Sequence, residues 1–172
     1  MKESAVGLIS FLKEAGEKFL KTGSSNQDST IPATQTTQVN IREKEQALER
    51  AILDYMAVQN LPIENLTVLY DSSAATVTVS GSAPDQQTRE KIILCCGNVQ
   101  GVAHVNDQIN VEQVAEESQW YTVKAGDTLS KISKEYYGNA NQYGVIFDAN
   151  KPMLKDPDKI YPGQLLRIPA KP

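Results

Sequence analysis

Two polar segments without an apolar period divide this chain into three parts. Residues 22–38 are rich in Ser, Thr, Gln and Asn, and residues 112–118 are short and acidic. Segments of this composition bury too little apolar surface to fold by themselves, so they are typical of linkers. The 172 residues therefore predict one short N-terminal unit and two small domains, because a domain commonly holds roughly 50 to 200 residues.

Charge and hydropathy argue against a nucleic-acid partner and against a transmembrane segment. The formal net charge is −4, whereas nucleic-acid binding needs a clustered basic face, so we expect no nucleic-acid partner. No apolar run approaches the roughly 20 residues that span a bilayer, and Lys13 and Glu14 interrupt the best one. These charges, together with Glu3, also disfavour a secretion signal. We therefore expect no transmembrane segment and a cytoplasmic location.

Residues 1–21 favour an amphipathic helix. Leu8, Leu12, Ala15 and Phe19 recur at spacings of three and four residues, which places them on one face of a helix. Most of the charged residues lie on the opposite face. The linker that follows would tether this helix, and the apolar face needs a surface to cover.

Residues 39–111 combine helical and extended patterns and predict an α+β domain. A helical period over residues 42–59 precedes two strand patterns, 66–70 and 76–80, which flank a short turn and favour a hairpin. A second helix is expected to begin near Ala83 and to end at Gly97. Alternating apolar residues then favour a last strand that ends at residue 111.

Two motifs of this region resemble those of the BON domain. They are TVTVSG at residues 76–81 and GVAHVND at residues 101–107. The resemblance implies helices packed on a small mixed sheet. Alternating valines and a glycine before a strand also occur in other small domains, so a generic split α/β domain remains the alternative.

Residues 119–172 predict a strand, two helices and a returning strand. Gly126 suits a tight turn, and Asp127 or Thr128 can accept the free amide hydrogens of the helix that follows. Gly163, after a proline, suits the turn into the last strand. The motifs WYTVKAGDTLSKI, IFDAN and IYPGQLLRIP resemble the LysM domain throughout, which implies the same order of elements.

No residue pattern supports catalysis. The single histidine, His104, has no acid or nucleophile beside it in the sequence, which favours a solvent-facing strand position. Cys95 and Cys96 are adjacent and lack both a CxxC spacing and a nearby histidine, which favours reduced thiols that pack as small apolar residues. There is no glycine-rich phosphate loop and no HExxH motif. We therefore expect a binding protein rather than an enzyme.

The LysM resemblance implies one candidate ligand. That family commonly binds N-acetylglucosamine in peptidoglycan or chitin through the two loops that border its helices, here residues 125–129 and 150–154. The contacts that this implies are Gly126, Asp127, Thr128, Leu129, Asn150 and Pro152. Turns and helix caps need the same types of residue, so a purely structural role stays open for each of them.

The order of the three units implies another ligand. FLKEAGEKF in the N-terminal helix, CCGNVQGVAHVNDQI in the BON-like domain and YYGNANQY in the LysM-like domain resemble the bacterial potassium-binding proteins of BON-LysM architecture. The linker 22–38 is longer and more polar than their pattern. The resemblance implies K⁺, with Rb⁺ or Cs⁺ as alternatives, held by backbone carbonyls. Matched motif to motif, these are the carbonyls of Leu12, Lys13, Ala15, Gly97, Val99 and Val102.

Physical chemistry agrees with neutral ligands for such an ion. A large monovalent cation is held well by neutral oxygens that replace its water shell, whereas a divalent ion calls for clustered carboxylates. We expect a monomer in which the ion orders the N-terminal helix and brings the BON-like and LysM-like domains into intramolecular contact.

Two other functions stay open at this stage. One is a glycan-binding LysM protein, and the other is an interaction or stress protein that places its N-terminal helix on membrane surfaces. In both cases Gly97 would only end a helix and Gly101 would only precede a strand.

Overall fold

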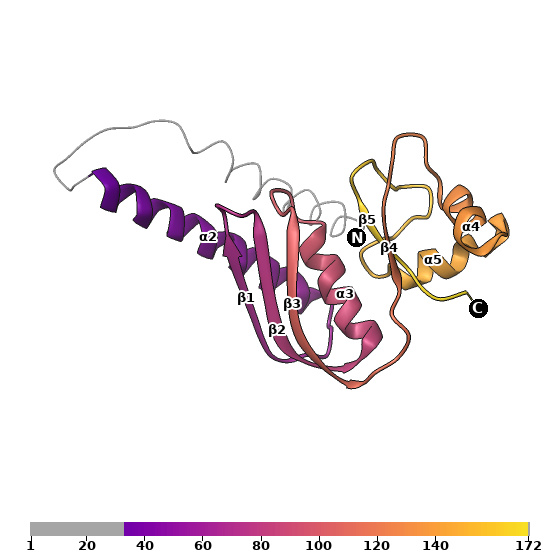
Figure 1. Cartoon of the computed structure of the whole chain (residues 1–172), viewed down its shortest axis with the longest axis horizontal. Coiled ribbons are helices and arrows are strands. Elements are labelled where there is room, and N and C mark those ends of the chain that lie inside the picture. The colour runs from indigo at the N-terminus through magenta and orange to yellow at the C-terminus, as the bar shows by residue number, and fades with distance from the viewer. Residues whose placement is uncertain (1–32, 172) are drawn as a thin grey trace, which may run out of the picture.

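The computed structural model describes residues 33–171, which form two small folded units joined by one connection (Figure 1). The first unit holds helices α2 and α3 with strands β1 to β3, and the second holds β4, α4, η1, α5 and β5. The α+β fold class is confirmed. The N-terminal helix expected over residues 1–21 lies outside the described residues, and so do the candidate ligands Leu12, Lys13 and Ala15.

The first unit has the order helix, strand, strand, helix, strand that the sequence predicts. Its elements are α2 (Ala33–Val58), β1 (Glu64–Asp71), β2 (Thr76–Asp85), α3 (Gln86–Gly97) and β3 (His104–Gln113). β1 and β2 form the expected antiparallel hairpin, in which Thr67 pairs with Ser80. β3 pairs with β2 in parallel after a crossover through α3. The sheet order is therefore β1-β2-β3.

Two boundaries differ from the expectation. α2 begins at Ala33 rather than at residue 42, so it includes part of the segment expected as a linker. Its first turns are rich in Thr and Gln, which lack an apolar period but do not break a helix. Strand β2 runs on to Asp85, whose carboxylate accepts a hydrogen bond from Thr88 N at 2.7 Å and caps α3.

At 26 residues α2 is the longest helix in the described part of the chain. Neither α2 nor any other helix within residues 33–171 is both long and apolar enough to cross a membrane.

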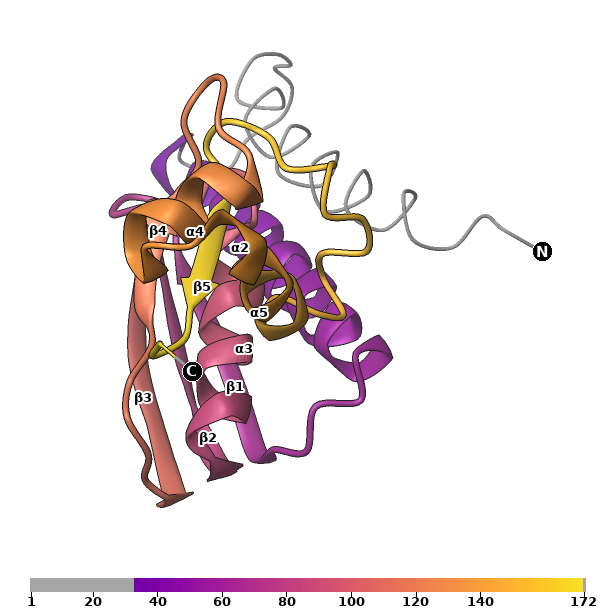
Figure 2. The same ribbon diagram turned by 90° about the vertical axis from the view of Figure 1, so that its right-hand side faces the viewer.

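One face of the three-stranded sheet carries the core of the first unit. Val68, Val77 and Val79 of the strands pack with Ile52 of α2 and Ile92 of α3 in a single buried cluster. Because both helices contribute to the same cluster, they cover the same face of the sheet (Figure 2). Strand residues with alternating exposure leave the opposite face open to solvent.

The second unit has the predicted order of strand, two helices and returning strand. Its elements are β4 (Gln119–Thr122), α4 (Leu129–Tyr137), the short 3-10 helix η1 (Ala140–Gln142), α5 (Tyr143–Ala149) and β5 (Leu165–Ile168). β4 and β5 pair antiparallel. Thr128 caps α4 by accepting a hydrogen bond from Lys131 N at 3.2 Å, and Gly138 ends the helix in the left-handed conformation at φ 75°.

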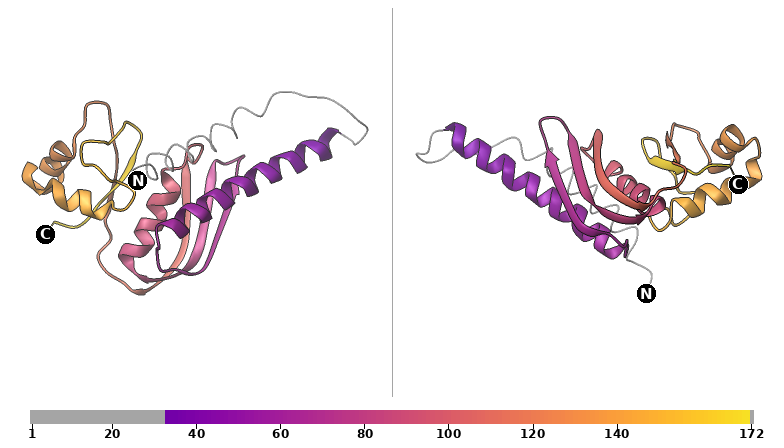
Figure 3. Two further views of the ribbon diagram at one scale, coloured as in Figure 1. Left: turned by 180° about the vertical axis from the view of Figure 1, so that it is seen from behind. Right: turned by 60° about the horizontal axis from the view of Figure 1, so that its bottom comes forward.

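Helix α3 lies between the sheet of the first unit and the second unit (Figure 3). It packs on β2 and β3 on one side and on β5 on the other. Met153 and Leu165 of the second unit join the apolar cluster of the first. Helix α3 is therefore the place where both units meet.

Candidate functional site

The turn that follows α3 forms one wall of the candidate site. Asn98 caps the helix by donating its backbone N–H to the Leu94 carbonyl at 3.3 Å. The chain then turns at Gly101, whose φ of 93° is the left-handed conformation that favours glycine. Tyr70 of β1 donates its hydroxyl to the Gly101 carbonyl at 2.8 Å, which ties the turn to the sheet. Residues 97–102 are called the carbonyl turn below.

The carbonyl turn borders a pocket of about 270 Å³. The other wall is the loop before β5, at residues 161–163. Two backbone hydrogen bonds hold this loop in place, because Gly163 N donates to the Val123 carbonyl at 2.8 Å and Val123 N donates to the Gln164 carbonyl at 2.9 Å. The pocket therefore lies between the two units. Among the described residues that line it, none carries a charged side chain.

Five oxygen atoms of the carbonyl turn have no hydrogen-bond donor within residues 33–171. The Val99 carbonyl accepts a hydrogen bond from Val102 N at 3.1 Å. Within residues 33–171, however, no donor reaches the carbonyls of Gly97, Asn98, Gln100 and Val102. The Oε1 atom of Gln100 is buried and has no partner in this part of the chain either. A buried polar atom without a partner costs about 1–3 kcal/mol, so the Gln100 Oε1 atom indicates an ion, a ligand or an ordered water beside it.

The structure brings the three candidate ligands of the first unit together. Gly97, Val99 and Val102 all line the same pocket. Coordination of an ion by their carbonyls stays a prediction. The other three candidate ligands, Leu12, Lys13 and Ala15, lie outside the described residues.

Sequence reasoning missed two parts of this pocket. Gln100 lies inside the carbonyl turn, and its neutral amide oxygen was a signal that could have been used. Residues 161–163 gave no such signal, because their place opposite the turn depends on how the two units pack.

The first loop of the candidate glycan site uses its polar side chains internally. The Asp127 carboxylate accepts hydrogen bonds from Lys124 N at 2.8 Å and from the Tyr121 hydroxyl at 2.7 Å. These two bonds lower the pKa of Asp127, and the bond to Asp127 raises the pKa of Tyr121 to about 12. The other candidates also have structural roles: Gly126 turns the chain at φ 83°, Thr128 caps α4 and Leu129 is buried.

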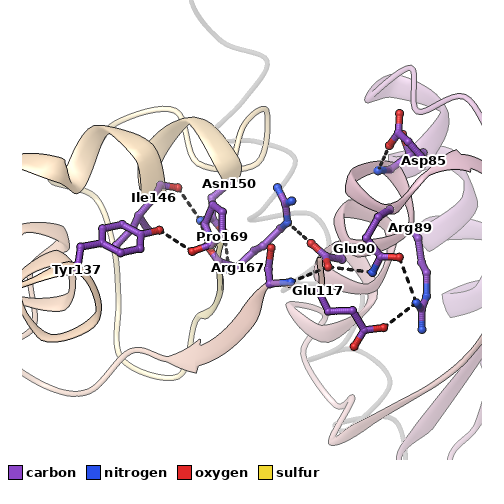
Figure 4. A network of polar contacts seen from close by, with 12 residues as sticks. Asp85, Arg89, Glu90, Glu117, Tyr137, Ile146, Asn150, Arg167 and Pro169 are labelled. Carbon is purple, nitrogen blue, oxygen red and sulfur yellow. Dashed lines mark hydrogen bonds and ion pairs between the residues drawn. The ribbon is translucent and has the colours of Figure 1, made fainter. Parts of the chain in front are cut away.

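The second loop is engaged in the same way. Asn150 is only 1% exposed. Its Nδ2 donates to the carbonyls of Ile146 and Arg167, both at 2.7 Å, and its Oδ1 accepts from Arg167 N at 2.9 Å (Figure 4). Pro152 is half-buried, and Met153 beside it contacts the first unit. The Asn150 side chain therefore holds β5 to the end of α5.

A buried ion pair joins the two units. Glu90 of α3 is 2% exposed and pairs with Arg167 of β5 (Figure 4). It also accepts hydrogen bonds from Gln86 Nε2 at 3.0 Å and from Ser118 N at 2.8 Å. Burial alone would raise the pKa of Glu90, but the hydrogen bonds from Gln86, Ser118 and Arg167 outweigh it and lower the pKa. The carboxylate is therefore ionised at neutral pH.

The cysteines and the histidine have the environments that the sequence predicts. Cys95 and Cys96 are free and buried, and burial raises the pKa of Cys95 to about 12, so it remains a thiol. The Cys95 sulfur lies 3.3 Å from the Met153 sulfur. His104 is exposed at the start of β3. Across residues 33–171, no group of three or more His, Cys, Asp and Glu residues is placed to hold a metal.

Comparison with known proteins agrees with both units. A BON domain model matches residues 44–113, and a LysM domain model matches residues 121–169. The chain is 42% identical over 167 residues to the potassium binding protein Kbp of Escherichia coli, a match that covers 96% of this chain and 100% of that protein. An uncharacterized protein of Deinococcus radiodurans is 52% identical over 50 residues, which are 29% of this chain and 19% of that protein. This chain belongs to the family of proteins with a BON domain followed by a LysM domain that includes Kbp.

Proposed function

We propose that this protein binds potassium in the pocket between the carbonyl turn and residues 161–163. The observation that carries the proposal is the set of oxygens of the carbonyl turn without donors in the described chain: the Oε1 atom of Gln100 and the carbonyls of Gly97, Asn98, Gln100 and Val102. All are neutral, and neutral oxygens suit a large monovalent cation that exchanges its water shell for protein ligands. The similarity to Kbp, a potassium binding protein, supports the same ion.

The chemistry of the lining separates this proposal from a calcium or magnesium site. Protein sites for Ca²⁺ and Mg²⁺ commonly include Asp or Glu carboxylates. No carboxylate is among the described residues that line the pocket. Rb⁺ and Cs⁺ are large monovalent cations like K⁺, whereas Na⁺ is smaller, so we propose Rb⁺ and Cs⁺ as alternative occupants.

The proposal assigns the rest of the coordination shell to the N-terminal segment. The carbonyls of Leu12, Lys13 and Ala15 would complete the shell that Gly97, Val99 and Val102 begin. A ligand shifts a conformational equilibrium only by its difference in affinity for the two states. An ion that contacts both segments would therefore favour the closed arrangement of a monomeric, cytoplasmic binding protein.

Binding of N-acetylglucosamine glycans, such as peptidoglycan, is a second candidate function, which the LysM match favours. The side chains of Asp127 and Asn150 already make hydrogen bonds within their own unit. A glycan would therefore depend on backbone groups and apolar surface in these loops. We rank this function below potassium binding.

The test is a titration of the cation-free protein with KCl and with NaCl at constant ionic strength. Heat of binding and the fluorescence of Trp120 report on it, because Trp120 of β4 pairs with Arg167 of β5 near the interface. We expect a saturable response to potassium that sodium does not produce. Equal responses to both salts, or none, would contradict the proposal.

A glycine substitution locates the response. Gly101→Ala places a side chain at φ 93°, where an added Cβ meets only the Tyr70 hydroxyl at 3.6 Å, so backbone strain is its main effect. We expect it to weaken potassium binding. The matched control is Gly144→Ala in α5, where an added Cβ meets nothing within 4 Å. If both variants bind potassium like the parent protein, the carbonyl turn is not the site.

A further inference from the structure

The side chain of Asn98 bonds to the LysM domain from within the carbonyl turn. Its Oδ1 accepts a hydrogen bond from Leu165 N at 2.8 Å, and its Nδ2 donates to the Leu165 carbonyl at 3.0 Å. The same Nδ2 donates to the Leu94 carbonyl at 3.0 Å. Both backbone groups of one β5 residue are therefore paired with a single side chain of the BON domain.

Close packing accompanies these bonds. A Cβ atom placed on Gly97 would lie 2.7 Å from the Leu165 Cδ2, so the absence of a side chain at Gly97 lets Leu165 approach the end of α3. Leu165 also packs against the apolar cluster of the BON domain. The contact between the carbonyl turn and β5 therefore has a polar part and an apolar part.

The position of β5 sets the position of the second wall of the pocket. The loop 161–163 leads directly into β5, and Gln164 N donates to the Tyr161 carbonyl at 3.1 Å. Asn98 lines the pocket itself and also holds the strand that carries the opposite wall. A shift of β5 away from Asn98 would open the pocket.

We infer that Asn98 is a positioning residue that couples cation binding in the pocket to docking of the LysM domain. This inference rests on the proposed function and adds the residue through which the two events are linked. Coupling is reciprocal, so docking raises the affinity for the cation by the same factor by which the cation favours docking. Typical coupling factors are about 5 to 150.

The experiment compares Asn98→Ala with the parent protein in the full chain. Asn106→Ala is the matched control, because Asn106 is an exposed β3 residue whose Nδ2 donates only to Thr78 Oγ1 at 3.3 Å. Calorimetry measures potassium affinity, and amide hydrogen exchange at Ser118, whose N–H donates to Glu90 of α3 at 2.8 Å, measures docking of the LysM domain. We expect the affinity to fall about tenfold in Asn98→Ala, within the usual range of coupling, and to stay unchanged in Asn106→Ala.

Hydrogen exchange at saturating potassium separates positioning from simple damage to the turn. In the parent protein, potassium should slow exchange at Ser118. In Asn98→Ala, exchange there should stay fast even when the ion site is full, because the bonds that link the turn to β5 are gone. If saturating potassium restores the protection, Asn98 only shapes the turn and the inference is wrong.

Gly97→Ala is a second variant for the case that Asn98→Ala does not fold. It keeps every hydrogen-bonding group, but its added Cβ pushes against the Leu165 side chain. We therefore expect it to lower potassium affinity as well, but by less than Asn98→Ala does. If potassium binds to the parent protein and both variants keep the parent affinity, the coupling is disproved while the proposed function stands. If the parent protein itself does not respond to potassium, both are disproved.

Discussion

The carbonyl turn of the BON domain and the two helix-bordering loops of the LysM domain were both candidate binding sites, and they differ in how they use their polar groups. In the LysM loops, Asp127 and Asn150 make all of their described hydrogen bonds within their own domain. In the carbonyl turn, the Gln100 Oε1 atom is buried without a partner in the described chain. The LysM loops use these polar groups to hold their fold, whereas the carbonyl turn keeps some of its polar groups available for a ligand.

The difference distinguishes scaffold from site where residue types alone do not. Gly, Asn and Asp occur in both regions, because turns and ligands both require them. The hydrogen bonds of these residues differ, however: a substitution in the LysM loops removes bonds within the domain and should cost stability. A substitution at Gln100 in the carbonyl turn should cost ion binding and leave stability nearly unchanged.

The largest effect is expected at the ion pair between Glu90 and Arg167, which joins the two domains. Arg167→Met leaves the Glu90 carboxylate buried without its cation, which should lower the free energy of unfolding by about 3–5 kcal/mol. Urea unfolding measures it. Lys159→Met is the control, because Lys159 is exposed and pairs at 3.5 Å with Asp156, whose side chain is also exposed, and such pairs contribute about 1 kcal/mol or less. Equal losses of unfolding free energy in the two variants would show that the buried pair at the domain interface contributes no more to folding than an exposed pair.

The next effect concerns the scaffold role of the second LysM loop. Asn150→Ala removes three hydrogen bonds and leaves the N–H and carbonyl of Arg167 without their partner, so we expect a loss of about 2–4 kcal/mol. Thermal unfolding measures it. Asn141→Ala, at an exposed position of η1, should change stability by less than about 0.5 kcal/mol. If Asn150→Ala is as stable as the parent protein, the hydrogen bonds of Asn150 do not hold the fold. The contrast between the LysM loops and the carbonyl turn would then fail.

The opposite behaviour is expected at the carbonyl turn. Gln100→Met removes the buried Oε1 atom while keeping a side chain of similar length. We expect potassium affinity to fall about tenfold, equivalent to about 1.4 kcal/mol, and stability without potassium to stay the same or to rise. Gln108→Met, at an exposed position of β3, is the control. A large loss of stability in Gln100→Met would mean that this side chain is scaffold as well.

The smallest effect is a change in titration at the first LysM loop. The hydrogen bond to Asp127 raises the pKa of Tyr121 from 10.0 to about 12. Because the folded pKa is raised, the bond contributes stability below pH 10.0 and loses it as the pH rises through about 12. Asp127→Asn should return the pKa of Tyr121 toward 10.0, which ultraviolet absorbance detects. An unchanged tyrosine titration would show that Asp127 is free for a ligand.

Much of the fold could be predicted from the sequence because its signals are local. The alternation of Val77 and Val79 with threonines predicts strand β2, and the cap residue Thr128 predicts the start of α4. The start of α2 at Ala33 could not be predicted, because its first turns have no apolar period. Local patterns describe each domain by itself.

The candidate site was predictable only in part, for a related reason. The motif around Gly97 and Val102 gave one wall of the pocket, and these residues do lie together. Tyr161 and the bonds between Asn98 and Leu165 belong to the packing of two domains. No spacing within either domain encodes that packing, so the second wall became visible only in the structure.

The most direct test of the central claim is a crystal structure of the full chain grown with rubidium in place of potassium. Rubidium scatters anomalously, so its position can be located independently of the protein atoms. The account predicts one strong anomalous peak in the pocket between residues 97–102 and residues 161–163, within bonding distance of the Gly97 and Val102 carbonyls. A pocket without rubidium, with the peak elsewhere on a protein that binds the ion in solution, would contradict it.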